Sequence, residues 1–207
     1  VHEDYIRAGA QVITANTFST ARHVLESIGL GDQVRSINEE AVQLARKARD
    51  NAADDEVWIA GSISSMAPFN NEEEVAVGES LNSNYREIAE ILAESGVDLF
   101  IVEMMRETVN SILIIEAALS TGLPVWIGYS AMMADDGKNV ITWRWKNVKS
   151  KPPTGDFEEL VKKTVNLGID AAGIMHSQVI DTEPALEVMS RHWHGPKLAY
   201  AETGALE

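Results

Sequence analysis

The chain has 207 residues, of which 45% are hydrophobic and 24% are charged. Its 17 Lys and Arg against 32 Asp and Glu give a formal net charge of −15, which excludes nucleic acid and anionic membrane surfaces as favoured partners. The absence of cysteine excludes a disulfide, a thiolate metal ligand and a thiol nucleophile. Neither a membrane-spanning run nor a signal-peptide pattern is present, so we expect a cytoplasmic protein.

Short apolar, β-rich runs alternate with helical patterns along the chain. In chain order, the runs are residues 12–17, 57–62, 97–103, 124–130, 169–176 and 197–203, and the helical patterns are about residues 1–9, 36–53, 85–95, 108–120, 156–166 and 182–192. Asp181 is the expected N-cap of the last helix. This alternation predicts βαβ units on a parallel sheet.

A closed (β/α)8 TIM barrel typically needs about 250 residues and eight βα units. The chain offers six strands, begins in a helical pattern and stops just past the last strand. We therefore predict one domain over residues 1–207, an incomplete TIM-type barrel with about six of its eight units and with both ends truncated. A doubly wound open sheet is the alternative, and it is disfavoured because no glycine-rich nucleotide motif follows any strand.

Polar residues end four of the predicted strands. They are Asn16, Glu103, His176 and Glu202. Active sites of parallel barrels lie at the carboxyl ends of the strands, so these residues are the candidates for chemistry. Asn16, followed by Thr17, is a candidate for ordering the rim of the site by its own hydrogen bonds, although a strand-end asparagine is equally typical of a turn cap.

Several segments at these strand ends resemble one family. They are residues 8–18, Gly61-Ser62-Ile63, residues 95–103, Leu123-Pro124-Val125-Trp126, Gly173-Ile174 and Tyr200 with Gly204. In this order they resemble the homocysteine S-methyltransferase family, which includes betaine-homocysteine methyltransferase and the homocysteine domain of cobalamin-dependent methionine synthase. The resemblance implies a (β/α)8 barrel in which zinc binds the homocysteine sulfur and a separate donor supplies a methyl group, giving methionine.

The resemblance also implies a zinc site built from cysteines, and this chain departs from it. The family's Gly-Ile-Asn-Cys segment reads Gly173-Ile174-Met175-His176 here, and the family's Gly-Gly-Cys-Cys segment falls beyond Glu207. His176 is the candidate metal ligand in place of a cysteine, with His23 on the same rim as a possible second. One histidine does not hold zinc at useful affinity, so we expect zinc binding and methyl transfer to be impaired.

By the same resemblance, Glu103 holds the amino group of homocysteine, with Asn16 and Thr17 as further substrate-binding candidates. A charge-assisted bond of this kind contributes about 1.5–3 kcal/mol when shielded. The alternative for Glu103 is an ion pair with the nearby Arg106. No residue is assigned a catalytic role.

Three functions are therefore open. The chain is a homocysteine methyltransferase using an unknown donor, a noncatalytic barrel relative that binds a small molecule or assists assembly, or a metal-free lyase with Glu103 and His176 as an acid–base pair. The partners implied by the resemblance are L-homocysteine and a small methyl donor. The open barrel edges predict a homo-oligomer that covers them.

Overall fold

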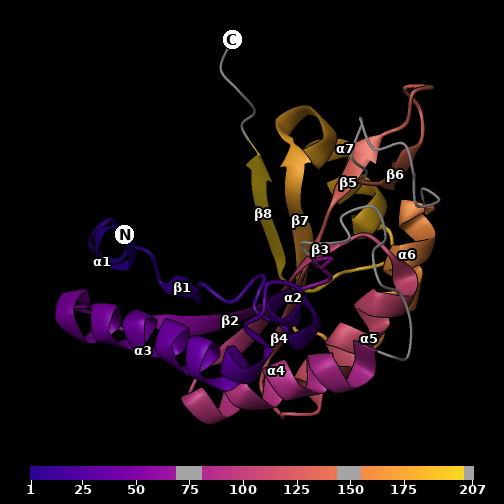
Figure 1. Cartoon of the computed structure of the whole chain (residues 1–207). Coiled ribbons are helices and arrows are strands. Elements are labelled where there is room, and N and C mark those ends of the chain that lie inside the picture. The colour runs from indigo at the N-terminus through magenta and orange to yellow at the C-terminus, as the bar shows by residue number, and fades with distance from the viewer. Residues whose placement is uncertain (69–80, 144–154, 203–207) are drawn as a thin grey trace.

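The computed structural model describes residues 1–68, 81–143 and 155–202. Its main sheet has six parallel strands in the order β1-β2-β3-β4-β7-β8. These are β1 (Val12–Ala15), β2 (Trp58–Ser64), β3 (Leu99–Met105), β4 (Val125–Tyr129), β7 (Ala171–Gln178) and β8 (Lys197–Glu202). The sheet curls into a trough with β1 and β8 at its two edges (Figure 1).

Helices cover the outer, convex face of this sheet (Figure 1). They include α3 (Val34–Ala52), α4 (Asn82–Ser95), α5 (Thr108–Leu119), α6 (Phe157–Thr164) and α7 (Val179–Ser190), with α1 (His2–Arg7) beside α3. A doubly wound sheet would carry helices on both faces. The one-sided cover and the curl confirm an incomplete (β/α) barrel.

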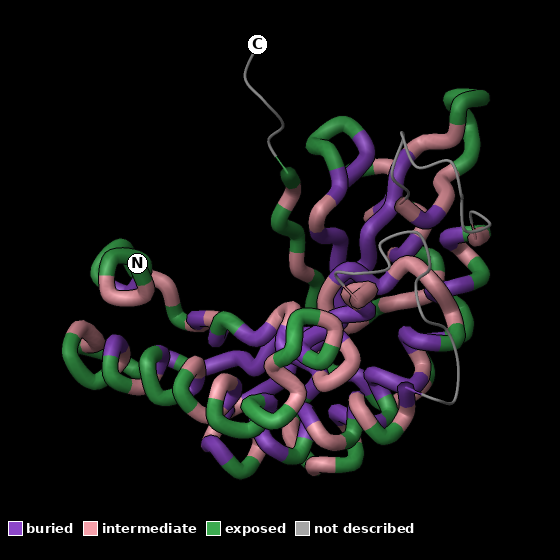
Figure 2. The backbone as a smooth tube through the Cα atoms, viewed as in Figure 1, coloured by how far each residue is buried: buried purple, intermediate pink, exposed green. Residues whose placement is uncertain are grey.

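The two faces of the strands have different environments because successive side chains alternate across a sheet. Ile59, Phe100, Ile127 and Ile174 face the helices and belong to one large buried cluster. Leu99 and its alternating neighbours face the trough, where they form a smaller cluster. Figure 2 shows the buried backbone concentrated where sheet and helices meet, so the convex face carries most of the core.

Some local elements differ from those expected from the sequence. A short helix α2 (Arg22–Glu26), a 3-10 turn η1 (Gly31–Gln33) and an antiparallel hairpin of β5 (Ala131–Met133) and β6 (Val140–Thr142) were not predicted. The hairpin strands have three residues each, which is too short for a periodic signal. Only Ser130 separates β5 from β4, so their apolar residues read as one run.

The prediction of Asp181 as an N-cap was wrong. Helix α7 begins at Val179, and its N-cap position is Gln178. Asp181 lies inside the first turn, where its carboxylate accepts a hydrogen bond from the backbone N–H of Met133 at 3.0 Å. The side chain satisfies a hairpin strand instead of the end of its own helix, a tertiary contact that local sequence does not reveal.

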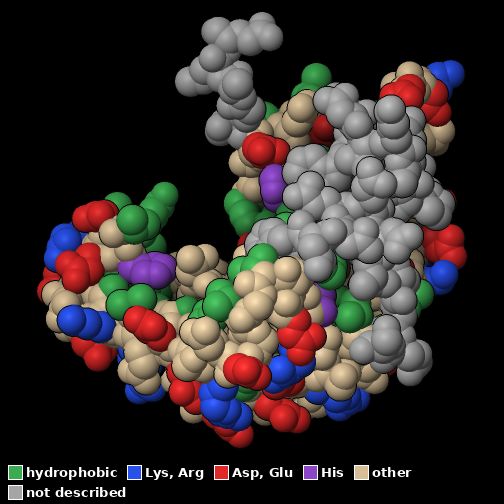
Figure 3. Space-filling model, viewed as in Figure 1, with side chains coloured by type: hydrophobic (Ala, Val, Ile, Leu, Met, Phe, Trp, Pro, Cys, Tyr) green, Lys and Arg blue, Asp and Glu red, His purple; other side chains and the backbone are tan. Residues whose placement is uncertain are grey.

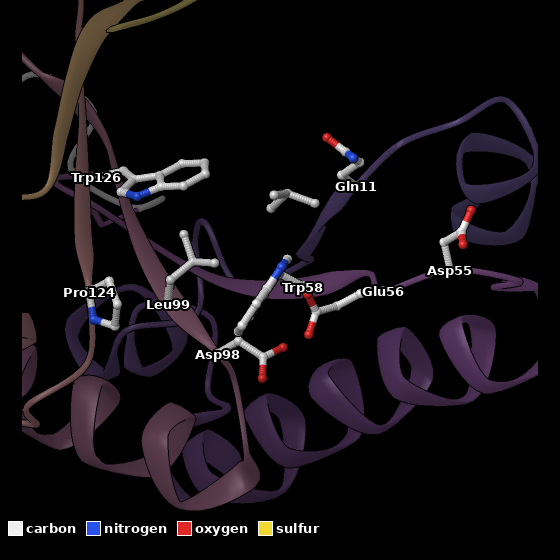
Figure 4. A pocket seen from close by; sticks show the side chains of 9 residues that line it. Gln11, Asp55, Glu56, Trp58, Asp98, Leu99, Pro124 and Trp126 are labelled. Carbon is white, nitrogen blue, oxygen red and sulfur yellow. The ribbon is translucent and has the colours of Figure 1, made fainter. Parts of the chain in front are cut away.

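The open side of the trough is hollowed and largely apolar. Figure 3 shows hydrophobic side chains along the gap between the N-terminal part of the chain and β8. A hollow of about 740 Å³ lies at the amino ends of the strands, and its lining includes Trp58, Leu99 and Trp126 with the carboxylates of Asp55 and Glu56. Trp126 and Leu99 project from neighbouring strands toward this space (Figure 4). In the described parts of the chain, no helix is long and apolar enough to cross a membrane.

Candidate functional site

Glu103 lies in β3 near the carboxyl end of the sheet and is half-buried. One of its carboxylate oxygens, Oε1, accepts a hydrogen bond from the hydroxyl of Tyr200 at 3.0 Å, and the other, Oε2, accepts one from the hydroxyl of Ser62. The expected alternative partner, Arg106, instead lies 5.7 Å above the ring of Trp143, and no ion pair joins Arg106 to Glu103 among the described contacts. Two uncharged donors therefore hold this carboxylate.

Tyr200 reaches Glu103 across the inside of the trough. It lies in β8, which β7 and β4 separate from β3 in the sheet. Gly128 of β4 leaves the space for this contact: a Cβ atom there would lie 2.9 Å from the Tyr200 hydroxyl oxygen and 2.6 Å from Cγ of Met175. The missing side chain of Gly128 therefore lets two distant strands meet.

Partial removal of the Tyr200 hydroxyl from water, together with the adjacent Glu103 carboxylate, raises the pKa of Tyr200 well above its ordinary value. Desolvation disfavours the phenolate, and a neighbouring negative charge disfavours it further. Tyr200 therefore stays protonated and donates to Glu103 throughout the physiological range.

Thr17 is fully buried and joins the first edge strand to this network. Its hydroxyl donates to the carbonyl oxygen of Ser62 at 2.8 Å, and it accepts from the backbone N–H of Ser62 at 3.1 Å. Asn16, the next residue back, is exposed and borders a different hollow between α1 and α3, lined also by His2 and Leu44. The structure thus brings Thr17 into the Glu103 network and places Asn16 outside it.

His176 forms a separate pair in β7. Its Nδ1 lies 3.3 Å from a carboxylate oxygen of Glu202, and its ring stacks on Trp143 with 5.8 Å between centroids. His23 does not join this pair: its Nε2 lies 3.1 Å from the carbonyl oxygen of Met66. Burial lowers the pKa of His23 below its ordinary value, so a neutral imidazole occupies this position.

Two non-glycine residues have positive φ in the described chain, Met104 at 56° and His176 at 47°. They lie at the register shifts of β3 and β7, where each strand loses its regular pairing. The backbone N–H of Met104 points to the sulfur of Met175 at 3.0 Å. Such conformations cost about 1–3 kcal/mol each and are concentrated at functional sites, and here they stand beside Glu103 and within the His176 pair.

The described residues do not fit a complete zinc site. No group of three or more His, Cys, Asp or Glu that could hold a metal ion occurs in the part of the chain that the structure describes. His176 and Glu202 together offer two ligands, whereas zinc sites in proteins use three or four. His176 stays a predicted metal ligand.

Sequence reasoning found Glu103 but gave no role to Ser62 or Tyr200. Both lie in segments that carry the family resemblance, Gly61-Ser62-Ile63 and the Tyr200 segment. Their positions in those segments were the one signal in the sequence that could have marked them as site residues. Their shared contact with one carboxylate depends on the curl of the sheet, which a linear pattern does not show.

The fold and the strand-end polar network define an incomplete (β/α)8-type barrel with its candidate site at the carboxyl ends of the strands. A sequence profile described as homocysteine S-methyltransferase matches residues 1–206. The chain belongs to the homocysteine S-methyltransferase family.

Individual relatives are distant. The chain is 25% identical over 201 residues to a selenocysteine methyltransferase of Astragalus bisulcatus, covering 82% of this chain and 56% of the relative. It is 25% identical over 130 residues to betaine–homocysteine S-methyltransferase 1 of Mus musculus, covering 60% of this chain and 30% of the relative. The chain thus spans little more than half of the first relative and less than a third of the second.

The fold also matches a solved structure. The metallated form of the homocysteine methyltransferase MmuM from Escherichia coli superposes with a TM-score of 0.76 at 22% identity, over 100% of this chain and 72% of that one. At this identity the likeness shows the fold alone. It agrees with the partial barrel, because part of the larger protein has no counterpart among these residues.

Proposed function

We propose that this chain forms the homocysteine-binding part of a methyltransferase that converts L-homocysteine to methionine with a small methyl donor. The observation that carries the proposal is the carboxylate of Glu103, held by two hydroxyl groups and by no cation among the described residues. A carboxylate has about four lone-pair positions. Two remain to accept hydrogen bonds from the ammonium group of an amino acid.

We further propose that methyl transfer itself is impaired in this chain. The reaction forms a sulfur–carbon bond while the bond between that carbon and the donor breaks, and the thiol must first lose its proton. The family's zinc, implied by the resemblance, would activate the sulfur when bound. The chain has no cysteine, and the described residues offer two candidate ligands at this place, His176 and Glu202. The histidine at position 176, where the family has a cysteine, favours the second candidate, a noncatalytic relative that retains binding.

Isothermal titration of L-homocysteine into the purified chain, with and without equimolar zinc, tests this function. We expect binding to the wild type and a loss of about tenfold or more in Glu103→Gln, because a neutral amide pairs poorly with an ammonium. Glu116→Gln, at an exposed position of α5, is the matched control and keeps wild-type affinity. Unchanged affinity in Glu103→Gln would contradict the proposal.

Zinc divides the two candidates in the same experiment. Homocysteine binding that strengthens with zinc supports a thiol-activating site and a methyltransferase. Binding that zinc leaves unchanged supports a binding protein without the family's chemistry. A metal-free lyase has less support, since Glu103 and His176 belong to separate pairs among the described contacts.

We also propose a homo-oligomer that covers the open side of the trough. Strands β1 and β8 are unpaired on one side in the described sheet, and Trp58 at the start of β2 is 44% exposed. Unpaired edges and exposed apolar patches favour association. Light scattering is expected to give a mass above 22.7 kDa, and a monomer at micromolar concentration would refute this.

A further inference from the structure

Tyr200 is the longest-range contact of Glu103. The two residues lie 97 positions apart in sequence, and β4 and β7 separate their strands. We propose that Tyr200 is a positioning residue, which holds the Glu103 carboxylate in the orientation that receives the ammonium group of the substrate. This inference rests on the proposed function and deepens it.

A glutamate needs such support because its side chain is long. Ordering a glutamate side chain costs up to about 2 kcal/mol of rotamer entropy. The Ser62 hydroxyl holds one oxygen from β2, and the Tyr200 hydroxyl holds the other from β8. Two donors from opposite sides fix the plane of the carboxylate. Fixing the plane also fixes the direction of the lone pairs that remain.

The chain is built to bring the Tyr200 hydroxyl to this place. Gly128 provides the space below the hydroxyl. Gly128 pairs with Gly173 across β4 and β7, and a Cβ atom on Gly173 would lie 1.8 Å from the carbonyl oxygen of Leu198. Both glycines therefore allow β8 and its tyrosine to come close. Ser62 is held in turn by the two hydrogen bonds of Thr17.

The tyrosine is suited to a polar role rather than a packing one. The residue as a whole is 39% exposed, while its hydroxyl lies against Glu103 and stays protonated because its pKa is raised. Tyr200→Phe removes the donor and leaves the ring, so it opens no cavity. The substitution is therefore expected to weaken only the recognition of the ammonium group that Glu103 binds.

The test compares two ligands by calorimetry, L-homocysteine and 4-sulfanylbutanoic acid, which has the same thiol and carboxylate but no amino group. Tyr200→Phe is expected to weaken L-homocysteine binding about tenfold, the effect of one hydrogen bond to a charged group. It is expected to leave 4-sulfanylbutanoic acid unchanged. Tyr5→Phe, at a 65% exposed position of α1, is the matched control and has no effect on either ligand.

A double variant adds a second readout. Tyr200→Phe with Glu103→Gln is expected to bind L-homocysteine no more weakly than Glu103→Gln alone, because Tyr200 acts through Glu103. An equal loss of affinity for both ligands in Tyr200→Phe would show a structural role and overturn the proposal. Unchanged L-homocysteine binding would overturn it as well.

Thermal unfolding of the same four proteins separates this proposal from the proposed function. Non-additive effects on stability in the double-variant cycle show that Tyr200 and Glu103 interact without any ligand. Coupling without L-homocysteine binding in the wild type would refute the proposed function, and with it the positioning role, while leaving the contact itself established. If Tyr200 and Glu103 are coupled and the wild type binds L-homocysteine, but Tyr200→Phe loses affinity equally for both ligands, the positioning role alone is refuted.

Discussion

Asp98 and Asp170 make equivalent pairs of hydrogen bonds. Each aspartate bonds one residue of the neighbouring strand through both its backbone N–H and its carboxylate. The backbone N–H of Asp98 donates to the carbonyl oxygen of Ile59 at 2.8 Å, and its carboxylate accepts from the N–H of Ile59 at 2.7 Å. Asp170 repeats this with Val125 at 2.8 and 2.9 Å. Each aspartate lies just before a strand, β3 or β7, so the pairs fix where neighbouring strands begin to align.

Replacement of either aspartate by alanine is expected to destabilise the fold. Loss of the acceptor leaves a strand N–H without its partner, at a cost of about 1–3 kcal/mol. Asparagine keeps an acceptor oxygen, so Asp98→Asn and Asp170→Asn are expected to cost less. Urea unfolding of the four variants measures these differences. Equal losses in the alanine and asparagine variants would show that charge, rather than the hydrogen bond, stabilises the start of the strand.

Gly173→Ala is expected to disrupt the pairing of β7 with β8. Its Cβ atom would meet the carbonyl oxygen of Leu198 at 1.8 Å, so the strand backbone must move. A loss of stability of about 3 kcal/mol or more is expected, with faster hydrogen exchange in β8. Gly155→Ala, whose Cβ would meet only ordinary contacts at 3.5 Å, is the control. Wild-type exchange in β8 of Gly173→Ala would refute this packing.

Gly128→Ala is expected to weaken homocysteine binding. The added Cβ would lie 2.9 Å from the Tyr200 hydroxyl oxygen, which must move away from Glu103. The loss of affinity should approach that of Tyr200→Phe, about tenfold, because the same hydrogen bond is lost. Calorimetry with L-homocysteine measures this. An unchanged affinity would mean that the hydroxyl keeps its bond after adjustment.

His23 is expected to make stability depend on pH. Burial outweighs the hydrogen bond to Met66 and the charge of Glu26, so the pKa of the folded state is lowered. Below about pH 6.5 the unfolded histidine takes up a proton while the folded one stays neutral. The free energy of unfolding therefore falls as pH drops below this value, until pH reaches the lowered pKa of the folded state.

The measurement is the unfolding free energy of His23→Gln between pH 7.5 and about pH 5, the range that spans the ordinary histidine pKa. Glutamine retains an N–H donor for Met66 but does not titrate, so a shallower dependence on pH is expected than in the wild type. His194→Gln, at an exposed position, is the matched histidine-to-glutamine control. Parallel curves for His23→Gln and the wild type would contradict the lowered pKa.

The sequence predicted the parallel strands and the main helices because apolar periodicity and glycine stops are local signals. Gly96, for example, ends α4 in the left-handed conformation with φ of 87°, as a glycine after a helix commonly does. The hairpin of β5 and β6 carried no such signal. Helix α7 also begins before the expected Asp181 because a tertiary hydrogen bond, to Met133, uses that side chain.

The site was predictable only in part for a related reason. Glu103 follows from its place at a strand end, but its donors come from β2 and β8. The Tyr200 contact requires the curl of the sheet and the bare backbone of Gly128. Thr17 joins the Glu103 network and Asn16 does not because of the path of the chain after β1. The alternation of strands and helices in the sequence does not determine that path.

The contact between Tyr200 and Glu103 has a consequence for folding. Tyr200 lies in β8, the last strand along the described chain, so the donor set of Glu103 is incomplete until that strand docks. Contacts between residues far apart in sequence form late because closing a long loop costs entropy. In a nascent chain that has not yet emerged past β8, Glu103 therefore lacks the hydrogen bond from Tyr200. Tight binding of the amino acid would then report that the whole sheet has assembled.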